Sequence, residues 1–344
     1  MKIIHTADIH LDSPLSGVKD SKRRRFELLT ALANMSEYAN NNGVQAIIVA
    51  GDLFDDKYTS AQTVESVISI VNDSKADWFV LKGNHGDNAP YEKLRQRCPS
   101  VKLFGENWTY YNCGGVTICG RELGFNDLEY WQKLSLDSSR FNVLVLHGDI
   151  DDDSYGYIDK KAIASSAVNY VALGHRHSLS ECKFGRIKGC YSGVLEARGF
   201  DETEPTGFIV IDTDSGKVKF QNQAVRSVVT VKIDVTDVMS DIALKKKIYD
   251  SVSQESSKNY LNAVFYGQLQ QGLQLKMIAE ETLKDRFFAL RIEDNTVPSY
   301  DLEKIAQEVS LRGEFVKLTN EQISDERLRG EIIKFGLNVL AGEL

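Results

Sequence analysis

Residues 46–55 read Ala-Ile-Ile-Val-Ala-Gly-Asp-Leu-Phe-Asp, a short apolar run that stops at Gly51 and Asp52. Short runs rich in Val and Ile are typical of strands buried on both faces of a sheet. Similar runs occur at 1–5, 78–81, 143–146 and 168–173. Apolar residues at helical spacing lie between the runs, at 26–39 and 63–71, and this alternation predicts an α/β domain.

Polar side chains follow all five apolar runs. They are Asp8, His10, Asp52, Asn84, His85, His147, His175 and His177. Ligands of α/β sheets bind at the carboxyl ends of the strands, so we expect these side chains to lie close together. Asp8 and His10 are two residues apart, and in extended chain they point to the same side; His175 and His177 repeat this spacing. His5 has the opposite parity, which favours a structural role.

Seven of these residues can bind metal: Asp8, His10, Asp52, Asn84, His147, His175 and His177. Carboxylate, imidazole and amide ligands suit Mn, Fe or Zn. Seven ligands exceed the needs of one tetrahedral site, whereas two ions that share a bridging carboxylate account for all of them. A lone core histidine more often satisfies a buried hydrogen bond, but that interpretation requires five strand ends to coincide by chance.

The series Asp8-x-His10, Gly51-Asp52-x-x-Asp55, Gly83-Asn84-His85, His147 and Gly174-His175-x-His177 resembles the calcineurin-like metallophosphoesterase superfamily. Residues 5–14 and 169–175 are similar to its DNA-repair exonuclease branch, the SbcD-type proteins with a YhaO-like subgroup. The resemblance implies a four-layer α/β/β/α sandwich of two mixed sheets, with a smaller α+β capping domain and C-terminal helices.

The resemblance also implies how the ligands divide between two divalent ions, Mn²⁺ before Fe or Zn. One ion would take Asp8, His10, Asp52 and His177. The other would take Asp52, Asn84, His147 and His175. Asp52 would bridge, and a hydroxide bound to the metals would attack phosphorus.

His85 would face the phosphate without binding metal, stabilise the developing charge and help protonate the leaving oxygen. In the family an acidic residue that orients the histidine usually follows Asn-His. Here Gly86 follows, with Asp87 next. Either Asp87 takes that role through a local shift, or another group holds His85.

We expect three regions: residues 1–224 form the catalytic domain, 225–297 an α+β capping domain, and 298–344 two C-terminal helices. The second of these helices, expected from Ser324, carries an apolar stripe of Leu328, Ile332, Phe335 and Val339. Such a stripe packs on its own domain about as often as on a partner. SbcD-type proteins dock C-terminal helices on an SMC-like coiled-coil ATPase of the SbcC or YhaN type, which makes this stripe a candidate partner-binding face.

Composition limits the possible partners. The formal net charge is −8, which argues against a broad basic surface for DNA, so a partner would supply part of the DNA track. Five cysteines without C-x-x-C spacing, the absence of a signal sequence and the absence of a long apolar run favour a cytoplasmic protein without a membrane span. A homodimer is compatible with the sequence.

Weaker signals concern the substrate. Phe54 and Tyr58 could stack on a base and Arg176 could bind substrate, although packing is the default for the two aromatic residues. The basic run 22–25 could touch phosphates, but a solvated helix start is favoured. For the acidic run 151–153 a solvated loop is favoured over a cation site.

The sequence thus favours a Mn²⁺-dependent DNA nuclease of DNA repair, an exonuclease or single-strand endonuclease. A phosphatase or a cyclic-nucleotide phosphodiesterase of the same superfamily is the first alternative. A non-catalytic scaffold is the second alternative, but that class would lack ligands. The residues after 225 favour the nuclease, because the SbcD-type proteins that the chain resembles carry a capping domain there, whereas a compact small-molecule phosphodiesterase would need fewer residues.

Overall fold

The computed structural model of the chain describes residues 1–15, 20–55, 59–85, 87–123, 128–150, 156–203, 205–270, 272–300 and 302–341. It divides into two compact units. The first comprises residues 1–230, 256–262 and 285–291, and the second comprises 231–255, 263–284 and 292–344. The boundaries expected at 224 and 297 stay predictions.

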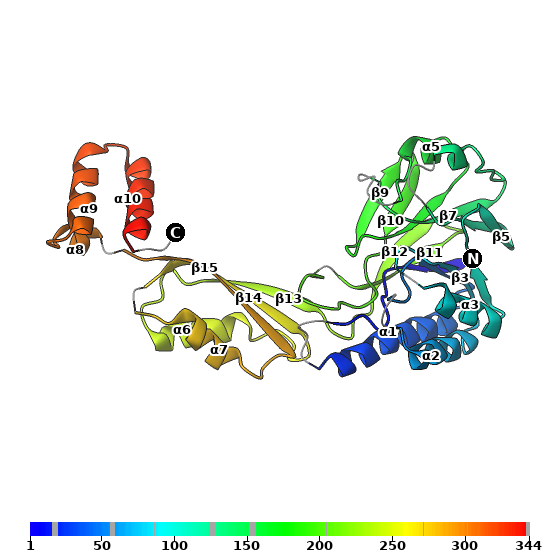
Figure 1. Ribbon diagram of the computed structural model, residues 1–344, viewed down its shortest axis with the longest axis horizontal. Coiled ribbons are helices and arrows are strands. Elements are labelled where there is room, and N and C mark those ends of the chain that lie inside the picture. The colour runs from blue at the N-terminus through cyan, green and yellow to red at the C-terminus, as the bar shows by residue number, and fades with distance from the viewer. Residues whose placement is uncertain are drawn as a thin grey trace. The chain divides into compact units, whose positions relative to one another are not determined.

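The first unit contains a six-stranded mixed sheet with the order β12-β11-β1-β2-β3-β4 (Figure 1). Its parallel strands are β1 (Lys2–Thr6), β2 (Ala46–Ala50), β3 (Asp77–Leu81) and β4 (Val101–Leu103). Strands β11 (Gly207–Asp212) and β12 (Lys217–Asn222) extend the sheet in antiparallel fashion beside β1. Helices α1 (Ser21–Asn41), α2 (Ala61–Asn72) and α3 (Asn88–Arg97) belong to this half of the unit.

A second six-stranded sheet has the order β5-β6-β7-β8-β10-β9. Its strands are β5 (Thr109–Cys113), β6 (Val116–Gly120), β7 (Phe141–His147), β8 (Tyr170–Gly174), β9 (Ser180–Phe184) and β10 (Ile187–Tyr191). The central pairs are parallel and the two edge strands antiparallel. The short helices α4 (Leu128–Trp131) and α5 (Lys160–Ala164) accompany it.

Three hydrophobic cores separate four layers. Alternate residues of β1 and β2 divide between two cores: Ile4 and Ile47 pack against α1–α3, whereas Ile3 and Ile48 pack against the second sheet. Leu144 of β7 points to the third core, with Ile163 of α5. This period of two is what the pleated backbone imposes, and it explains why buried parallel strands read as continuous apolar runs. The expected α/β/β/α sandwich is confirmed.

Local signals fix the helices of the first unit. Asp20 caps α1 by accepting a hydrogen bond from Arg23 N, and Ser60 caps α2 by accepting from Thr63 N, each satisfying a donor that the first turn leaves unpaired. Both helices present an apolar stripe to the sheet, in α2 through Val64, Val67, Ile68 and Val71.

A three-stranded sheet follows, with the order β13-β14-β15. Its strands are β13 (Val228–Asp234), β14 (Tyr260–Leu269) and β15 (Ala289–Pro298), and α6 (Asp241–Ser251) lies between the first two in the chain. Helix α7 (Leu275–Leu283) was not expected, although it buries Leu275, Ile278, Ala279 and Leu283.

Residues 302–341 hold three helices where two were expected: α8 (Leu302–Ala306), α9 (Leu311–Gln322) and α10 (Glu326–Ala341). Val309 lies beyond the end of α8 and is fully exposed. Ser310 caps α9 by accepting from Gly313 N, and a Cβ at Gly313 would lie 2.3 Å from Glu308 O. Helix α10 begins at Glu326 rather than at Ser324, with Asp325 accepting from Leu328 N.

No helix within the described ranges is long and apolar enough to cross a membrane.

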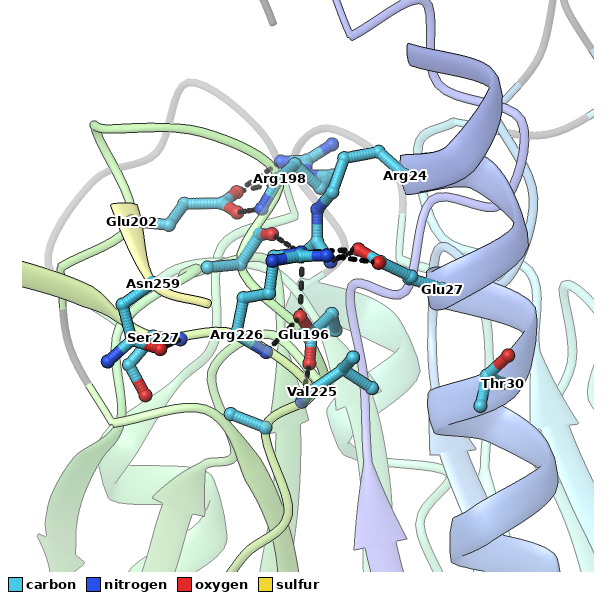
Figure 2. A network of polar contacts seen from close by, with 12 residues as sticks. Arg24, Glu27, Thr30, Glu196, Arg198, Glu202, Val225, Arg226, Ser227 and Asn259 are labelled. Atoms are coloured by element: carbon cyan, nitrogen blue, oxygen red, sulfur yellow. Dashed lines mark hydrogen bonds and ion pairs between the residues drawn. The ribbon is translucent and has the colours of Figure 1, made fainter. Parts of the chain in front are cut away.

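A buried ionic cluster joins α1 to the segment that precedes β13 (Figure 2). Arg24 is fully buried, and its guanidinium donates to Glu27 and to Glu196 at 2.6 Å each. Arg226 clamps the same Glu27 carboxylate with bonds of 2.6 and 2.7 Å. The expectation of a solvated helix start was therefore wrong for Arg24, because two carboxylates compensate its charge inside the protein.

We predict that Glu27→Gln lowers the free energy of unfolding by about 3–5 kcal/mol, because it takes the carboxylate partner from the buried Arg226 guanidinium and leaves Arg24 with Glu196 alone. Burial opposes ionisation, but Arg226 and Arg24 outweigh it and hold the pKa of Glu27 at about 2, below its ordinary 4.5. This stabilisation is therefore fully present above about pH 4.5 and is lost as the pH falls towards 2.

Urea unfolding of both proteins between pH 7 and pH 3 measures this difference. Glu65→Gln is the control, because Glu65 makes comparable contacts with Lys93 and Arg97 at the surface. An equal loss in both variants, or a deficit of Glu27→Gln that does not shrink on acidification, would contradict the prediction.

Candidate metal centre

Four of the chemistry-bearing residues lie just beyond strands, in left-handed backbone. Strand β1 ends at Thr6, and Asp8 and His10 have φ of 51° and 46°; Asp52 and His175 have φ of 54° and 101°. Such angles are costly for residues other than glycine and cluster at functional sites. The expectation that extended chain aligns Asp8 with His10 and His175 with His177 was therefore wrong in its geometry, although ligand atoms of Asp8 and His10 do lie close together.

Hydrogen bonds between the turns hold this strained backbone. Asp8 N donates to Gly51 O at 3.1 Å, and His10 N donates to Asp52 O at 2.9 Å. His175 N, at the end of the second sheet, donates to both oxygens of the Asp8 carboxylate at 3.0 and 3.1 Å. The loops after β1, β2 and β8 thus form one connected platform.

Two glycines make room for the side chains. Gly51 has φ of 107°, and a Cβ there would lie 2.0 Å from Nδ1 of His147. Gly83 has φ of 88°, and its Cβ would lie 2.3 Å from Oδ1 of Asp52. Both positions need glycine for conformation and for space.

The expected ligands come together in two groups that meet at Asp52. In the first, potential ligand atoms of Asp8, His10 and His177 all lie within 4.8 Å of one another. Oδ2 of Asp52 is 3.6 Å from Nε2 of His10.

The same Asp52 oxygen is 3.3 Å from Nε2 of His147 in the second group. Oδ1 of Asn84 lies 2.7 Å from that Nε2 and 3.3 Å from Nδ1 of His175. One carboxylate oxygen therefore faces imidazoles from both groups, which is the arrangement of a bridging ligand.

The electrostatics of the centre fit a cation. Burial raises the pKa of Asp8 to about 7 and lowers that of His10 to about 3. Burial would also lower the pKa of His147, but the Asp52 carboxylate outweighs it and raises this pKa to about 9. Both ring nitrogens of His10 are buried without a hydrogen-bond partner among the described residues. Burying unpaired polar atoms is costly, and a divalent ion would satisfy them.

His85 lies at the exposed side of this centre. Its ring centroid is 5.1 Å from that of His10, and its backbone N donates to Oδ1 of Asp52 at 2.9 Å. Ligand-type atoms of His10, Asp55 and His85 lie within 4.8 Å of one another. Asp55 was not among the expected site residues, although its place in Gly51-Asp52-x-x-Asp55 was a signal.

Asp87 occupies the cap position of α3 with extended backbone, and no hydrogen bond or ion pair joins it to His85 in the described parts of the chain. Gly86 lies outside the described residues, as do Tyr58 and residues 151–153. The role expected for Asp87 therefore stays a prediction.

The other candidate side chains have structural partners. Phe54 is fully buried and packs edge-to-face on Tyr91 at 5.2 Å, so its assignment as a base-stacking residue was wrong. Arg176 binds both oxygens of Asp149 at 2.9 and 2.6 Å and lies over Tyr191. His5 contacts the Tyr170 hydroxyl and Leu173 O at 3.1 Å each, in keeping with a structural role.

Sequence reasoning missed the residues behind His177. Oε1 of Glu202 lies 3.1 Å from Nδ1 of His177 and accepts from Nη2 of Arg198 at 2.6 Å. Burial opposes ionisation of Glu202, but His177 and Arg198 lower its pKa to about 2. Outside a helix, a spacing of four residues between an Arg and a Glu does not indicate that their side chains meet.

We predict that Gly83→Ala reduces bound divalent metal by at least an order of magnitude, because its Cβ would collide with the Asp52 carboxylate. Gly43→Ala is the control. Gly43 has φ of 64° with no atom within 4 Å of the added Cβ, so this variant meets backbone strain of about 1–2 kcal/mol without a clash. Elemental analysis after dialysis against Mn²⁺ measures the difference, and equal metal content in both variants would contradict it.

The chain is similar to one protein family and to several known proteins. The sequence profile of the family described as calcineurin-like phosphoesterase matches residues 1–182. The chain is 25% identical to the uncharacterized metallophosphoesterase YhaO of Bacillus subtilis over 283 residues, 75% of this chain and 69% of the relative. It is 24% identical to a subunit of the nuclease SbcCD of Staphylococcus epidermidis, over 72% of this chain and 76% of the relative.

A more partial relative is the DNA double-strand break repair protein Mre11 of Methanosarcina acetivorans, 24% identical over 68% of this chain and 41% of the relative. Among solved structures, an archaeal phosphodiesterase has a TM-score of 0.39 at 13% identity, over 65% of this chain and all of that one. A dimetal phosphatase from Danio rerio has a TM-score of 0.42 at 11% identity, over 61% and 91%. With the family profile spanning more than half of its residues, the chain belongs to the calcineurin-like phosphoesterases and is a metal-dependent phosphoester hydrolase.

Proposed function

We propose that this phosphoesterase is a Mn²⁺-dependent DNA nuclease that hydrolyses phosphodiesters at a two-ion centre. The observation that carries the proposal is the Asp52 carboxylate, whose Oδ2 faces His10 at 3.6 Å and His147 at 3.3 Å. DNA as substrate is supported by the relatives, which include a component of a nuclease and DNA double-strand break repair proteins.

In this proposal Asp8, His10, Asp52 and His177 hold one ion, and Asp52, Asn84, His147 and His175 hold the other. Two such ions would polarise a water and a phosphoryl oxygen for in-line displacement. Four imidazoles in the set favour Mn²⁺ over Mg²⁺, which prefers oxygen ligands. The backbone bonds among the three loops keep these side chains in place before substrate arrives.

His85 takes a different role. Its side chain is exposed beside the buried His10, so it can reach a phosphate placed over the centre. We assign to it the stabilisation of charge on the phosphate and protonation of the leaving oxygen. Asp55, close to both His10 and His85, is the described carboxylate that can orient the ring, whereas Asp87 could do so only after a local shift.

We predict that His85→Asn retains both ions but cleaves DNA about a hundredfold more slowly, whereas Asp52→Asn loses both ions and most activity. End-labelled DNA and a small phosphodiester, each with Mn²⁺, Mg²⁺ or chelator, measure cleavage, and elemental analysis measures the ions. Loss of metal in His85→Asn would reassign that residue.

The same assay decides between substrates. Cleavage of the small phosphodiester with no cleavage of DNA would mark the chain as a small-molecule phosphodiesterase. Full activity in chelator would contradict the two-ion centre itself.

We also propose a partner for the C-terminal helices. The side of α10 that packs on Val316 of α9 consists of Ile333 and Leu337. The predicted stripe lies elsewhere on the helix: Leu328 is 48% exposed, Phe335 65% and Val339 41%, with Ile332 half-buried. An exposed apolar stripe is the usual binding face of a helix laid in a groove. The resemblance of the chain to SbcD-type proteins favours an SMC-like coiled-coil ATPase as the partner.

We predict that Phe335→Glu prevents co-purification with such an ATPase while metal-dependent hydrolysis by the isolated chain is unchanged. Leu311→Glu is the matched control, because Leu311 is a comparably exposed apolar residue, on α9. If Phe335→Glu retains the complex, the interface lies elsewhere on the chain. If both variants lose the complex, the loss is not specific to the stripe and the proposed interface is contradicted.

A further inference from the structure

Residues 196–202 run as a loop between two polar clusters of the first unit. Figure 2 shows the first cluster and the Arg198–Glu202 pair of the second. We call this segment the strap. One of its ends contacts the buried cluster of Arg24, Glu27 and Arg226. The other end contacts His177, a proposed metal ligand.

At the His177 end, the strap holds one ring nitrogen. Nδ1 of His177 is 3.1 Å from Oε1 of Glu202, and that oxygen also accepts from Nε and Nη2 of Arg198 at 3.0 and 2.6 Å. Oε2 of Glu202 accepts from the backbone N of Arg198 at 2.6 Å. Both carboxylate oxygens are therefore engaged, so the carboxylate has a fixed orientation towards the imidazole.

This geometry leaves two alternatives for the proton on the ring. If Nδ1 carries it, Nδ1 donates to Glu202 and the lone pair of Nε2 is available for a metal ion. If Nε2 carries it, Nδ1 instead accepts from Nη2 of Arg198, which lies 2.9 Å away, and His177 cannot bind metal through Nε2. A carboxylate accepts a hydrogen bond more strongly than a neutral imidazole nitrogen does, which favours donation from Nδ1 to Glu202, and a ligating histidine commonly donates its second N–H in this way.

At the other end, the strap is fixed to structure outside itself. The Glu196 carboxylate accepts from Arg24 at 2.6 Å and from the backbone N of Val225 and Arg226 at 2.6 and 3.0 Å. Arg24 also donates to Ala197 O. The first residues of the strap thus move only if α1 or the chain entering β13 moves.

The middle of the strap is held by aromatic and charged contacts. The Phe200 ring packs edge-to-face on Tyr260 at 5.3 Å, and the Arg291 guanidinium lies 4.7 Å from the Phe200 centroid. Arg291 also pairs with Asp201 at 3.3 Å. Contacts along its whole length leave the strap little freedom to rotate Glu202 away from His177.

We propose that Glu202, held by Arg198 and by the anchored strap, is a positioning residue that selects the Nδ1–H tautomer of His177 and so prepares Nε2 for a metal ion. The inference rests on the proposed two-ion centre, and it adds that affinity for the ion on the His177 side depends on a carboxylate outside the ligand set. Loss of such a partner typically weakens metal binding by 10–100-fold.

The test uses Glu202→Gln in the full chain, stripped of metal and titrated with Mn²⁺ in a calorimeter. Glutamine keeps an acceptor oxygen but removes the charge that holds the proton on Nδ1. We expect one of two binding steps to weaken by 10–100-fold while the other changes little. Glu308→Gln is the matched control, because Glu308 and Arg312 form the same Glu–Arg contact across four residues, in the second unit, and it should leave both steps unchanged.

A second measurement does not depend on any variant. In the chain loaded with Zn²⁺, which is diamagnetic, long-range ¹H–¹⁵N spectra report which imidazole nitrogen carries the proton. We expect the proton on Nδ1 of His177.

A further variant, Arg198→Lys, keeps the positive charge but loses the two-pronged contact with Glu202. In the Mn²⁺ titration it should show an affinity between those of the wild type and Glu202→Gln.

Two results would overturn the inference: wild-type affinity for both ions in Glu202→Gln, or a proton on Nε2 of His177 in the loaded chain. Neither measurement uses DNA or turnover. A chain that binds two ions and responds to Glu202→Gln yet cleaves no DNA therefore refutes the proposed nuclease and leaves this inference standing.

Discussion

The site depends on the contacts that the Asp52 carboxylate makes with both sheets. One of its oxygens accepts from the backbone of His85, and the other faces His10 and His147, which come from different sheets. This meeting requires the carboxyl ends of β1 and β2 in one sheet and of β7 in the other to lie on the same edge of the sandwich. The core between the sheets, with Ile48 and Val145 among its members, sets that alignment. Packing in the middle layer thus determines the geometry of charged groups at the edge.

The turns that bring these side chains together have strained backbones, and contacts between the loops offset that strain. Asp8, His10, Asp52 and His175 adopt backbone angles that typically cost about 1–3 kcal/mol each. Their backbone groups bond across the three loops, so no one turn can relax without breaking contacts of another. The same loops bury two carboxylates and the His10 imidazole, whose ring nitrogens have no hydrogen-bond partner among the described residues, and this combination is stable only with charge compensation. The stability of the sandwich therefore holds these groups ready for a cation.

The α/β pattern and the gathering of the polar strand ends could be predicted because both follow from local patterns, whereas the four-layer sandwich was implied by the resemblance to the metallophosphoesterases. Buried strands such as Ala46–Ala50 read as apolar runs, and parallel strands bring their carboxyl ends together whatever the loops do. The left-handed turns could not be predicted, since Asp8-Ile9-His10 is as compatible with extended chain as with the turn observed.

Other features escaped prediction because their partners are distant in the chain. The charge of Arg24 is matched by Glu196, and the position of Glu202 is fixed by His177, over separations that no periodicity records. Phe54 illustrates the converse: its neighbour Asp52 suggested a site residue, but its side chain points into the core against Tyr91. Gly313 weakened the apolar pattern of α9, which hid one helix of three.

Helix α10 shows what the spacing of apolar residues cannot predict. It carries apolar side chains on more than one face, so spacing alone cannot say which of them packs inward. The structure buries Ile333 and Leu337 against Val316 and leaves Phe335 and Val339 exposed. A helix that is apolar on two faces is stable in water only at the cost of leaving one face hydrated, unless a second surface covers it. The small core formed with α8 and α9 buries only the apolar side chains on the inner face of α10. The apolar side chains on the outer face have no place in that core, which is the physical argument for a partner.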